Sequence, residues 1–112
     1  MSDQEQQDRR EAARLDIEMW VEESRERETY FQRCTNLSAG GLFLDRTIPH
    51  PVGTVVRLRF TLPDGSGPID TRGEIVNAED GSRLGMGVKF LDLPDDARAR
   101  ITELVAREKK ET

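Results

Sequence analysis

The stretch Thr35-Asn36-Leu37-Ser38-Ala39-Gly40-Gly41-Leu42-Phe43-Leu44 decides the fold, because it has the pattern of two short strands joined by a tight glycine turn. Asn36 and Ser38 are two residues apart, so on an extended backbone their side chains point to the same face. We expect Gly40 and Gly41 to turn the chain through backbone angles that other residues avoid. Two short polar side chains beside such a turn suit hydrogen bonding to a ligand, although the same residues also occur in ordinary turns.

The size and composition of the chain fit one small and rather polar domain. It has 112 residues, of which 35% are hydrophobic and 35% are charged. The net charge of -5 is expected to repel nucleic acid and anionic membranes, so an anionic ligand needs a local basic cluster. Only Lys89, Lys109 and Lys110 are lysines. The other basic residues are arginines, whose planar side chains suit two-bond contacts to phosphate and guanine.

The cysteine count and the N-terminus bear on metal sites and localisation. Cys34 is the single cysteine, so no internal disulfide can form, and one Cys with one His cannot make a zinc site. The N-terminal residues contain no apolar run of a secretory signal, and no stretch has the apolar length of a membrane span. We therefore expect a cytoplasmic protein without a bound metal.

Hydrophobic alternation predicts the first strand. Leu15, Ile17, Met19 and Val21 alternate with polar residues, as in a half-buried strand. Trp20 falls on the polar face, and we expect it to pack under a neighbouring element or a partner subunit. The charged segment 23–27 that follows is predicted to be a hairpin loop.

Five further strands and one helix are predicted downstream. Turn-forming residues separate strands at about 28–36, 42–46, 56–62, 69–77 and 85–91, a spacing typical of an antiparallel barrel or sandwich. Pro94 suits the first position of a helix, which presents Ala97, Ile101, Leu104 and Val105 on one apolar face. The sequence thus predicts an all-β fold with a C-terminal helix that covers part of it.

Residues 1–14 are polar and are predicted to form a flexible N-terminal arm. The arm ends in Arg9-Arg10-Glu11-Ala12-Ala13-Arg14, directly before the first strand. Two interpretations of its arginines stay open. They could bind an anionic ligand, or they could be a solvated charge run that pairs with nearby acidic residues such as Asp16.

Two spaced motifs resemble the signature of the PilZ domain family. Arg10-x-x-x-Arg14 matches the pattern RxxxR, and Asn36-x-Ser38-x-x-Gly41 matches (D/N)xSxxG. The strand Gly85-Met86-Gly87-Val88-Lys89-Phe90 before a helix also resembles the end of that family. The resemblance covers residues 9–107. It implies a six-stranded antiparallel β-barrel at 15–93, a helix at 94–110, and binding of the bacterial second messenger cyclic di-GMP.

The resemblance also implies roles for individual residues. Arg10 and Arg14 correspond to the paired arginines, which can clasp a guanine because a guanidinium matches its O6 and N7 acceptors. The second motif is supplied by Asn36, Ser38 and Gly41. Arg9 is an additional arginine that in the family can favour an intercalated ligand dimer. The small residues Ala12-Ala13 depart from the bulkier ones frequent between the arginines, which could loosen the arm and lower the affinity.

No pattern in the sequence indicates an enzyme. His50 lies between two prolines and is expected to be a loop residue without a nucleophile to serve. Cys34 lies in a strand and is expected to be inert. The acidic pairs Asp95-Asp96 and Glu22-Glu23 are interpreted as a helix start and a loop rather than as acid–base pairs.

Three functions of different classes remain open for such a chain. The favoured one is a cyclic di-GMP receptor whose arm orders on binding and alters contact with an unknown downstream protein. The alternative is a PilZ-like adaptor that acts through protein contacts without nucleotide. A barrel that binds single-stranded nucleic acid is disfavoured by the charge of -5 and the aromatic content of 5%. The sequence leaves open whether the protein is a monomer or a homodimer.

Overall fold

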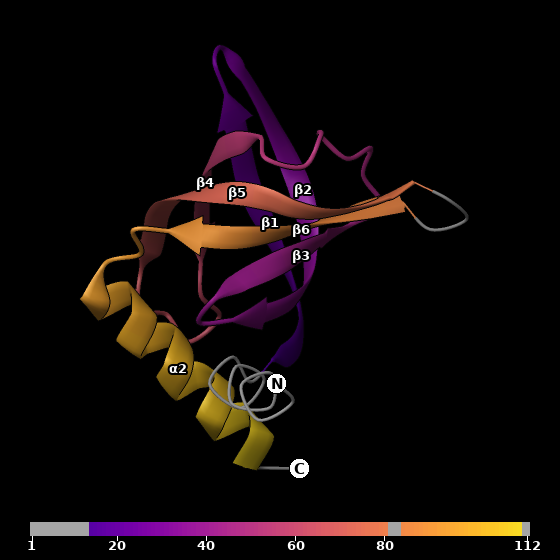
Figure 1. Ribbon diagram of the computed structural model, residues 1–112. Coiled ribbons are helices and arrows are strands. Elements are labelled where there is room, and N and C mark those ends of the chain that lie inside the picture. Colours follow the sequence, from indigo (N-terminus) through magenta and orange to yellow (C-terminus); the bar gives the residue numbers. More distant parts are fainter. Residues whose placement is uncertain (1–13, 81–83, 111–112) are drawn as a thin grey trace, which may run out of the picture.

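Six strands followed by one helix make up the fold. The computed structural model describes residues 14–80 and 84–110. Its elements are β1 (Leu15–Arg25), β2 (Glu28–Ser38), β3 (Gly41–Asp45), β4 (Val55–Thr61), β5 (Pro68–Asp80), β6 (Leu84–Leu91) and α2 (Asp95–Lys110) (Figure 1). The expected arm at 1–14 falls, except for Arg14, outside the described residues. Its flexibility and the proposed division of the chain therefore stay predictions.

The strands close into one barrel in the order β1-β2-β3-β6-β5-β4. Every neighbouring pair is antiparallel, and β4 completes the ring by pairing with β1. Because β3 pairs with β6, residues far apart in the sequence become neighbours on the outer face of the barrel. The predicted six-stranded antiparallel β-barrel with a C-terminal helix is confirmed.

The barrel interior is filled from alternate strand positions. In β4, Val56, Leu58 and Phe60 are buried while the residues between them are exposed, which is the period-two pattern of a strand with one face in the core. The rings of Phe60 and Phe90 stack with centroids 6.0 Å apart. The other buried hydrophobic side chains are Val21, Cys34, Leu37, Leu42, Leu44, Leu62, Ile69, Ile75, Met86, Val88, Leu93, Ala97, Ile101, Leu104 and Val105.

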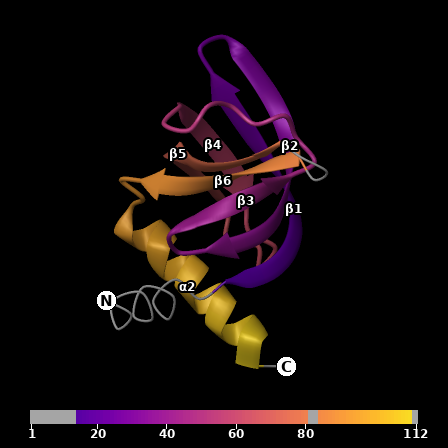
Figure 2. The ribbon, with the colours of Figure 1, turned by 45° about the vertical axis from the view of Figure 1, so that its right-hand side comes forward.

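Helix α2 covers one end of the barrel. It begins with Asp95 and Asp96, whose negative charges favour the positive end of the helix dipole. The predicted stripe of Ala97, Ile101, Leu104 and Val105 is buried against the barrel. Figures 1 and 2 show that α2 crosses the end opposite the projecting β1–β2 hairpin. No helix among the described residues is long and apolar enough to cross a membrane.

Residues of the connection between β4 and β5 hold α2 on one side through hydrogen bonds and an ion pair. The Arg100 guanidinium donates hydrogen bonds to the carbonyl oxygens of Ser66 at 2.8 Å and Gly67 at 2.7 Å. About two turns further along the helix, Arg107 lies 3.6 Å from the carboxylate of Asp64. These contacts add to the buried apolar stripe that holds the helix.

The charged segment 23–27 is not a loop, so that prediction is wrong. Strand β1 runs to Arg25 and β2 begins at Glu28, which leaves only a two-residue turn, Glu26–Arg27. Glu22 and Glu23, interpreted above as loop residues, therefore lie inside β1. Glu22 pairs with Phe31 and Glu23 with Tyr30 in the neighbouring strand. Local charge did not predict this, because the hydrogen-bond partners of Glu23, which are Gln32 and His50, lie outside the segment.

Glu23 belongs to a partly buried polar group, which we call the inner cluster: Glu23, Gln32 and His50. The Glu23 side chain is 0% exposed. Its carboxylate accepts a hydrogen bond from Gln32 Nε2 at 3.0 Å and lies 2.9 Å from His50 Nε2. A buried carboxylate needs such partners, because an unpaired charge in the interior is costly. His50 is a loop residue as predicted, but the structure also makes it the partner of Glu23.

Trp20 is 67% exposed, so the expectation that it packs under another element of the chain is wrong. Trp20 pairs with Arg33, and Glu22 pairs with Phe31, which places Trp20 and Phe31 diagonally on one outer face. Phe31 is 69% exposed. Helix α2 covers a barrel end rather than this face, which explains why the tryptophan stays uncovered (Figure 1).

Candidate functional site

The decisive stretch forms a hairpin whose turn is held by a buried serine. Ser38 pairs with Gly41, so Ala39 and Gly40 make a two-residue turn. The Ser38 hydroxyl accepts a hydrogen bond from the Gly40 amide at 3.1 Å and donates one to the Gly41 carbonyl at 3.4 Å. Its side chain is only 4% exposed. In this conformation Ser38 therefore shapes the turn.

The expectation that Gly40 and Gly41 turn the chain through angles that other residues avoid is wrong, since neither of them has a positive φ. All glycines with a positive φ in the described part of the chain lie in other loops. Gly41 is needed for a different reason: a Cβ added there would lie 2.1 Å from the Val88 carbonyl oxygen of β6. At Gly40 the nearest atom to an added Cβ is the Ser38 oxygen, at 3.8 Å. Gly41 thus permits close packing of β3 against β6.

Arg14 contacts the second motif directly. Its Nη1 donates a hydrogen bond to Asn36 Oδ1 at 2.9 Å. The Asn36 amide nitrogen in turn donates to Asp16 Oδ1 at 3.3 Å, across the β1–β2 ladder. Both ends of the amide are thereby oriented, with its carbonyl toward the arginine. Residues 22 positions apart in the sequence meet in this way at the start of β1.

Cys34 supports this region from the core side. Its thiol is buried and donates a hydrogen bond to the Asn36 carbonyl oxygen at 3.3 Å. Burial raises the pKa of the thiol to about 11. The thiolate is the nucleophilic form, so the raised pKa agrees with the expectation that Cys34 is inert.

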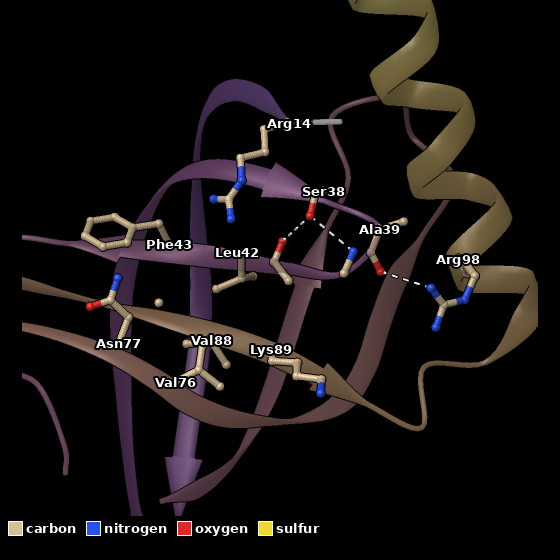
Figure 3. Close-up of a pocket in the computed structure, with 13 residues that line it drawn as sticks. Arg14, Ser38, Ala39, Leu42, Phe43, Val76, Asn77, Val88, Lys89 and Arg98 are labelled. Carbon is tan, nitrogen blue, oxygen red and sulfur yellow. Dashed lines mark hydrogen bonds between the residues drawn. The ribbon is translucent and has the colours of Figure 1, made fainter. Parts of the chain in front are cut away.

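A pocket of about 520 Å³ lies beside the hairpin turn, in the size range of small-molecule sites (Figure 3). Part of its wall is the outer face of β3 and β6, where Gly41 pairs with Lys89 and Phe43 with Gly87. The two glycines leave room between the larger side chains. The pocket is lined by Arg14, Ser38, Ala39, Gly40, Gly41, Leu42, Phe43, Val76, Asn77, Gly87, Val88, Lys89 and Arg98.

The charges that line this pocket are all positive. Arg14, Lys89 and Arg98 contribute them, and no acidic residue is among the described lining residues. This contrasts with the net charge of -5 of the chain. A pocket of this kind favours an anionic ligand, because the local field differs in sign from that of the protein as a whole.

The structure brings together four of the six residues predicted for the site. Arg14, Ser38 and Gly41 line the pocket, and Asn36 adjoins it through its hydrogen bond to Arg14. The other two, Arg9 and Arg10, lie outside the described residues.

Sequence reasoning missed Lys89 and Arg98. Only the pairing of β3 with β6 brings Lys89 beside Gly41, and only the packing of α2 brings Arg98 to the turn. The strand 85–91 was predicted, but its pairing with the strand that contains Gly41 was not. That pairing was the one signal that could have identified Lys89.

Comparison of the sequence with known families identifies a PilZ domain over residues 8–107. The chain belongs to the PilZ domain family. The match spans nearly the whole chain and includes both motifs that suggested the resemblance. A comparison with curated proteins found no match.

Solved structures with the PilZ fold resemble the chain closely in shape at low sequence identity. The Bacillus subtilis inhibitor of motility MotI/DgrA has a TM-score of 0.82 at 18% identity, over 93% of this chain and 53% of that protein. The chain therefore spans about half the length of that protein. The PilZ domain of YcgR from Escherichia coli, solved with c-di-GMP, has a TM-score of 0.68 at 16% identity, over 93% and 98%. The PilZ domain of CeSA from a cellulose-synthesizing bacterium has 0.63 at 20%, over 88% and 99%.

Proposed function

We propose that this PilZ domain is a receptor for cyclic di-GMP that passes the binding signal to another protein and has no catalytic activity. The single observation that carries the proposal is the 2.9 Å hydrogen bond from Arg14 to Asn36, which joins the two sequence motifs at a cationic pocket. The similarity of fold to a PilZ domain solved with c-di-GMP supports the choice of ligand.

The geometry suits recognition of a guanine and its phosphate. The Arg14 guanidinium has five donors, and its recorded hydrogen bond to Asn36 uses one nitrogen. The remaining donors can serve the O6 and N7 acceptors of guanine, and the flat group can stack on a purine. The Asn36 amide is already oriented by Arg14 and Asp16, so little side-chain entropy remains to be lost when a ligand binds.

In this proposal, ordering of the N-terminal arm is the structural change that ligand binding causes. Arg10 would clasp the ligand together with Arg14, and Arg9 would contribute if two ligand molecules bind stacked together. Ordering the arm over the pocket would create a surface that the empty protein lacks. We propose a cytoplasmic location and a downstream protein partner, with motility as one candidate process because one structural relative is a motility inhibitor.

Calorimetric titration with cyclic di-GMP tests the proposal, with cyclic di-AMP and GTP as controls. Binding is expected for cyclic di-GMP alone. Arg14→Ala is expected to weaken it at least about tenfold, since a charge-assisted hydrogen bond contributes roughly 1.5–3 kcal/mol. Ser38→Ala is expected to weaken binding as well, because the turn loses its internal hydrogen bonds.

Two outcomes would contradict this proposal. A folded wild-type protein that does not bind cyclic di-GMP would instead favour the adaptor that acts through protein contacts. Binding that survives both substitutions unchanged would place the ligand elsewhere on the barrel. Thermal unfolding of each variant separates loss of binding from loss of the fold.

A further inference from the structure

We infer that Lys89 and Arg98, which belong to neither sequence motif, form a second cationic wall of the pocket that binds a phosphodiester group of the ligand. The inference rests on the proposed function, because it concerns the same pocket and the same cyclic dinucleotide. It adds two binding residues from β6 and α2 to those of the arm and the hairpin.

The position of the two cations is set by the fold. Lys89 is an exposed residue of β6 directly beside Gly41, which has no side chain to separate it from the pocket. Arg98 lies in the first half of α2, where its Nη1 contacts the Ala39 carbonyl oxygen in the hairpin turn. Figure 3 shows Arg14 and Lys89 on opposite sides of the β3 strand, with Arg98 on α2 beside the hairpin turn. A ligand held by Arg14 would therefore meet these cations at its far side.

Neither cation has an ion-pair partner among the described residues. Six arginines elsewhere in the described chain each have a carboxylate within 4.0 Å: Arg33, Arg46, Arg59, Arg72, Arg100 and Arg107. The acidic residue nearest to Lys89 in the strand ladder is its cross-strand neighbour Glu74, and no ion pair joins them. The charges of Lys89 and Arg98 are therefore available to an anion.

The contact that Arg98 makes in this state is weak. Its distance of 3.4 Å to the Ala39 carbonyl is at the long end for a hydrogen bond, and the acceptor is uncharged. A phosphate oxygen is a stronger acceptor for a guanidinium and can accept two parallel bonds. An exchange of the Ala39 carbonyl for a phosphate is therefore favourable, and it would connect ligand binding to α2.

A cyclic dinucleotide has the chemistry that such a wall requires. It carries two phosphodiester groups, so a clasp on one guanine and its neighbouring phosphate leaves a second negative charge to be neutralised. The rest of the chain cannot do this by its overall field, because its net charge is -5. Lysine supplies a compact charge and arginine a planar fork, and the two together can neutralise one phosphodiester.

The test compares the affinity of the full chain for cyclic di-GMP in four variants: Lys89→Gln, Arg98→Gln, Arg98→Lys and the control Arg57→Gln. Arg57 is an exposed arginine of β4 outside the pocket, with no ion-pair partner in the described part of the chain, so its substitution removes one charge of the same kind. Lys89→Gln and Arg98→Gln are each expected to weaken binding about tenfold. Arg98→Lys is expected to keep part of the affinity, and Arg57→Gln to stay within about twofold, as for a distant, screened charge.

A second measurement repeats the titrations at low and high salt. Because a charge–charge contact is screened by salt, the affinity of wild type is expected to fall more steeply with salt than that of Lys89→Gln or Arg98→Gln. If wild type binds and both Gln variants match Arg57→Gln in affinity and in salt dependence, this inference fails while the proposed function stands. If folded wild type does not bind at all, both fail together.

Discussion

Two groups of polar side chains in this barrel have opposite environments. The inner cluster lies near the β1–β2 hairpin, and the carboxylate of its fully buried member Glu23 has the half-buried Gln32 and His50 as partners for its two oxygens. The pocket at the other end exposes Arg14, Lys89 and Arg98 without a carboxylate among its lining residues. The first arrangement stabilises the fold, because its polar groups satisfy each other. The second leaves three positive charges without a carboxylate partner among the described residues, so they are available for the anionic ligand proposed above. The comparison predicts that changes in the inner cluster alter stability and leave affinity intact.

Gly41→Ala is expected to have the largest effect, since it damages the pocket through the backbone. The added Cβ would lie 2.1 Å from the Val88 carbonyl oxygen, and a backbone atom paired in a sheet cannot move aside cheaply. We expect the free energy of unfolding to fall by about 3 kcal/mol, the upper end for an overpacked site, with loss of ligand binding. Gly40→Ala is the matched control, because its nearest contact is at 3.8 Å. Denaturant unfolding of both variants checks this, and equal stability would contradict it.

His50→Ala tests the inner cluster. Removal of the imidazole leaves the fully buried Glu23 carboxylate with Gln32 alone. Breaking a buried pair costs about 3–5 kcal/mol, and we expect about 2–3 kcal/mol here because His50 is 21% exposed and water can replace it. The affinity for cyclic di-GMP is expected to stay within twofold of wild type. A variant that unfolds as wild type does, or that loses ligand affinity while folded, would break the comparison.

The pH dependence of unfolding tests whether Cys34, next to the pocket, belongs to the core. Burial raises the pKa of its thiol from 9.0 to about 11, so the unfolded chain releases this proton at lower pH than the folded one. The stabilisation is complete below pH 9 and is lost as the pH rises toward 11. By linkage, the loss at pH 10 is about 1.4 kcal/mol. Denaturant unfolding of wild type and Cys34→Ala at pH 8 and pH 10 measures it, and an identical pH dependence in the two proteins would contradict it.

Trp20→Ser is expected to have the smallest effect. In the single chain the indole is 67% exposed, so its removal should change the free energy of unfolding by less than about 0.5 kcal/mol. Denaturant unfolding at several protein concentrations checks this. A larger loss that grows with concentration would show that a second copy of the chain covers this face, and that the Trp20 surface is a dimer contact.

The sequence predicted the strands that have one face in the core and the helix that follows them. The alternation of Val56, Leu58 and Phe60 can be recognised from the local sequence alone, because successive residues of a strand point to opposite faces. The same is true of the apolar stripe of α2. The motif residues Arg14, Asn36, Ser38 and Gly41 were also predicted for the site, and the structure places them together. Their role in ligand binding stays a prediction.

What the sequence could not predict depends on contacts between distant residues. Glu23 was interpreted as a loop residue, because its hydrogen-bond partner His50 comes 27 positions later in the sequence. The requirement for Gly41 comes from the backbone of β6, and the pairing of β3 with β6 is not encoded in either strand alone. Trp20 is exposed because α2 packs on a barrel end, and the helix sequence does not say which surface it covers.

The unequal fastening of α2 has a mechanical consequence. On the side of the β4–β5 connection, Arg100 makes short hydrogen bonds to Ser66 and Gly67, whereas on the pocket side Arg98 makes one long bond to Ala39. A helix attached in this way has its pivot at the firmly bonded side. A ligand that displaced the Ala39 carbonyl from Arg98 would remove the weaker of the two attachments, so we expect α2 to move first on the pocket side.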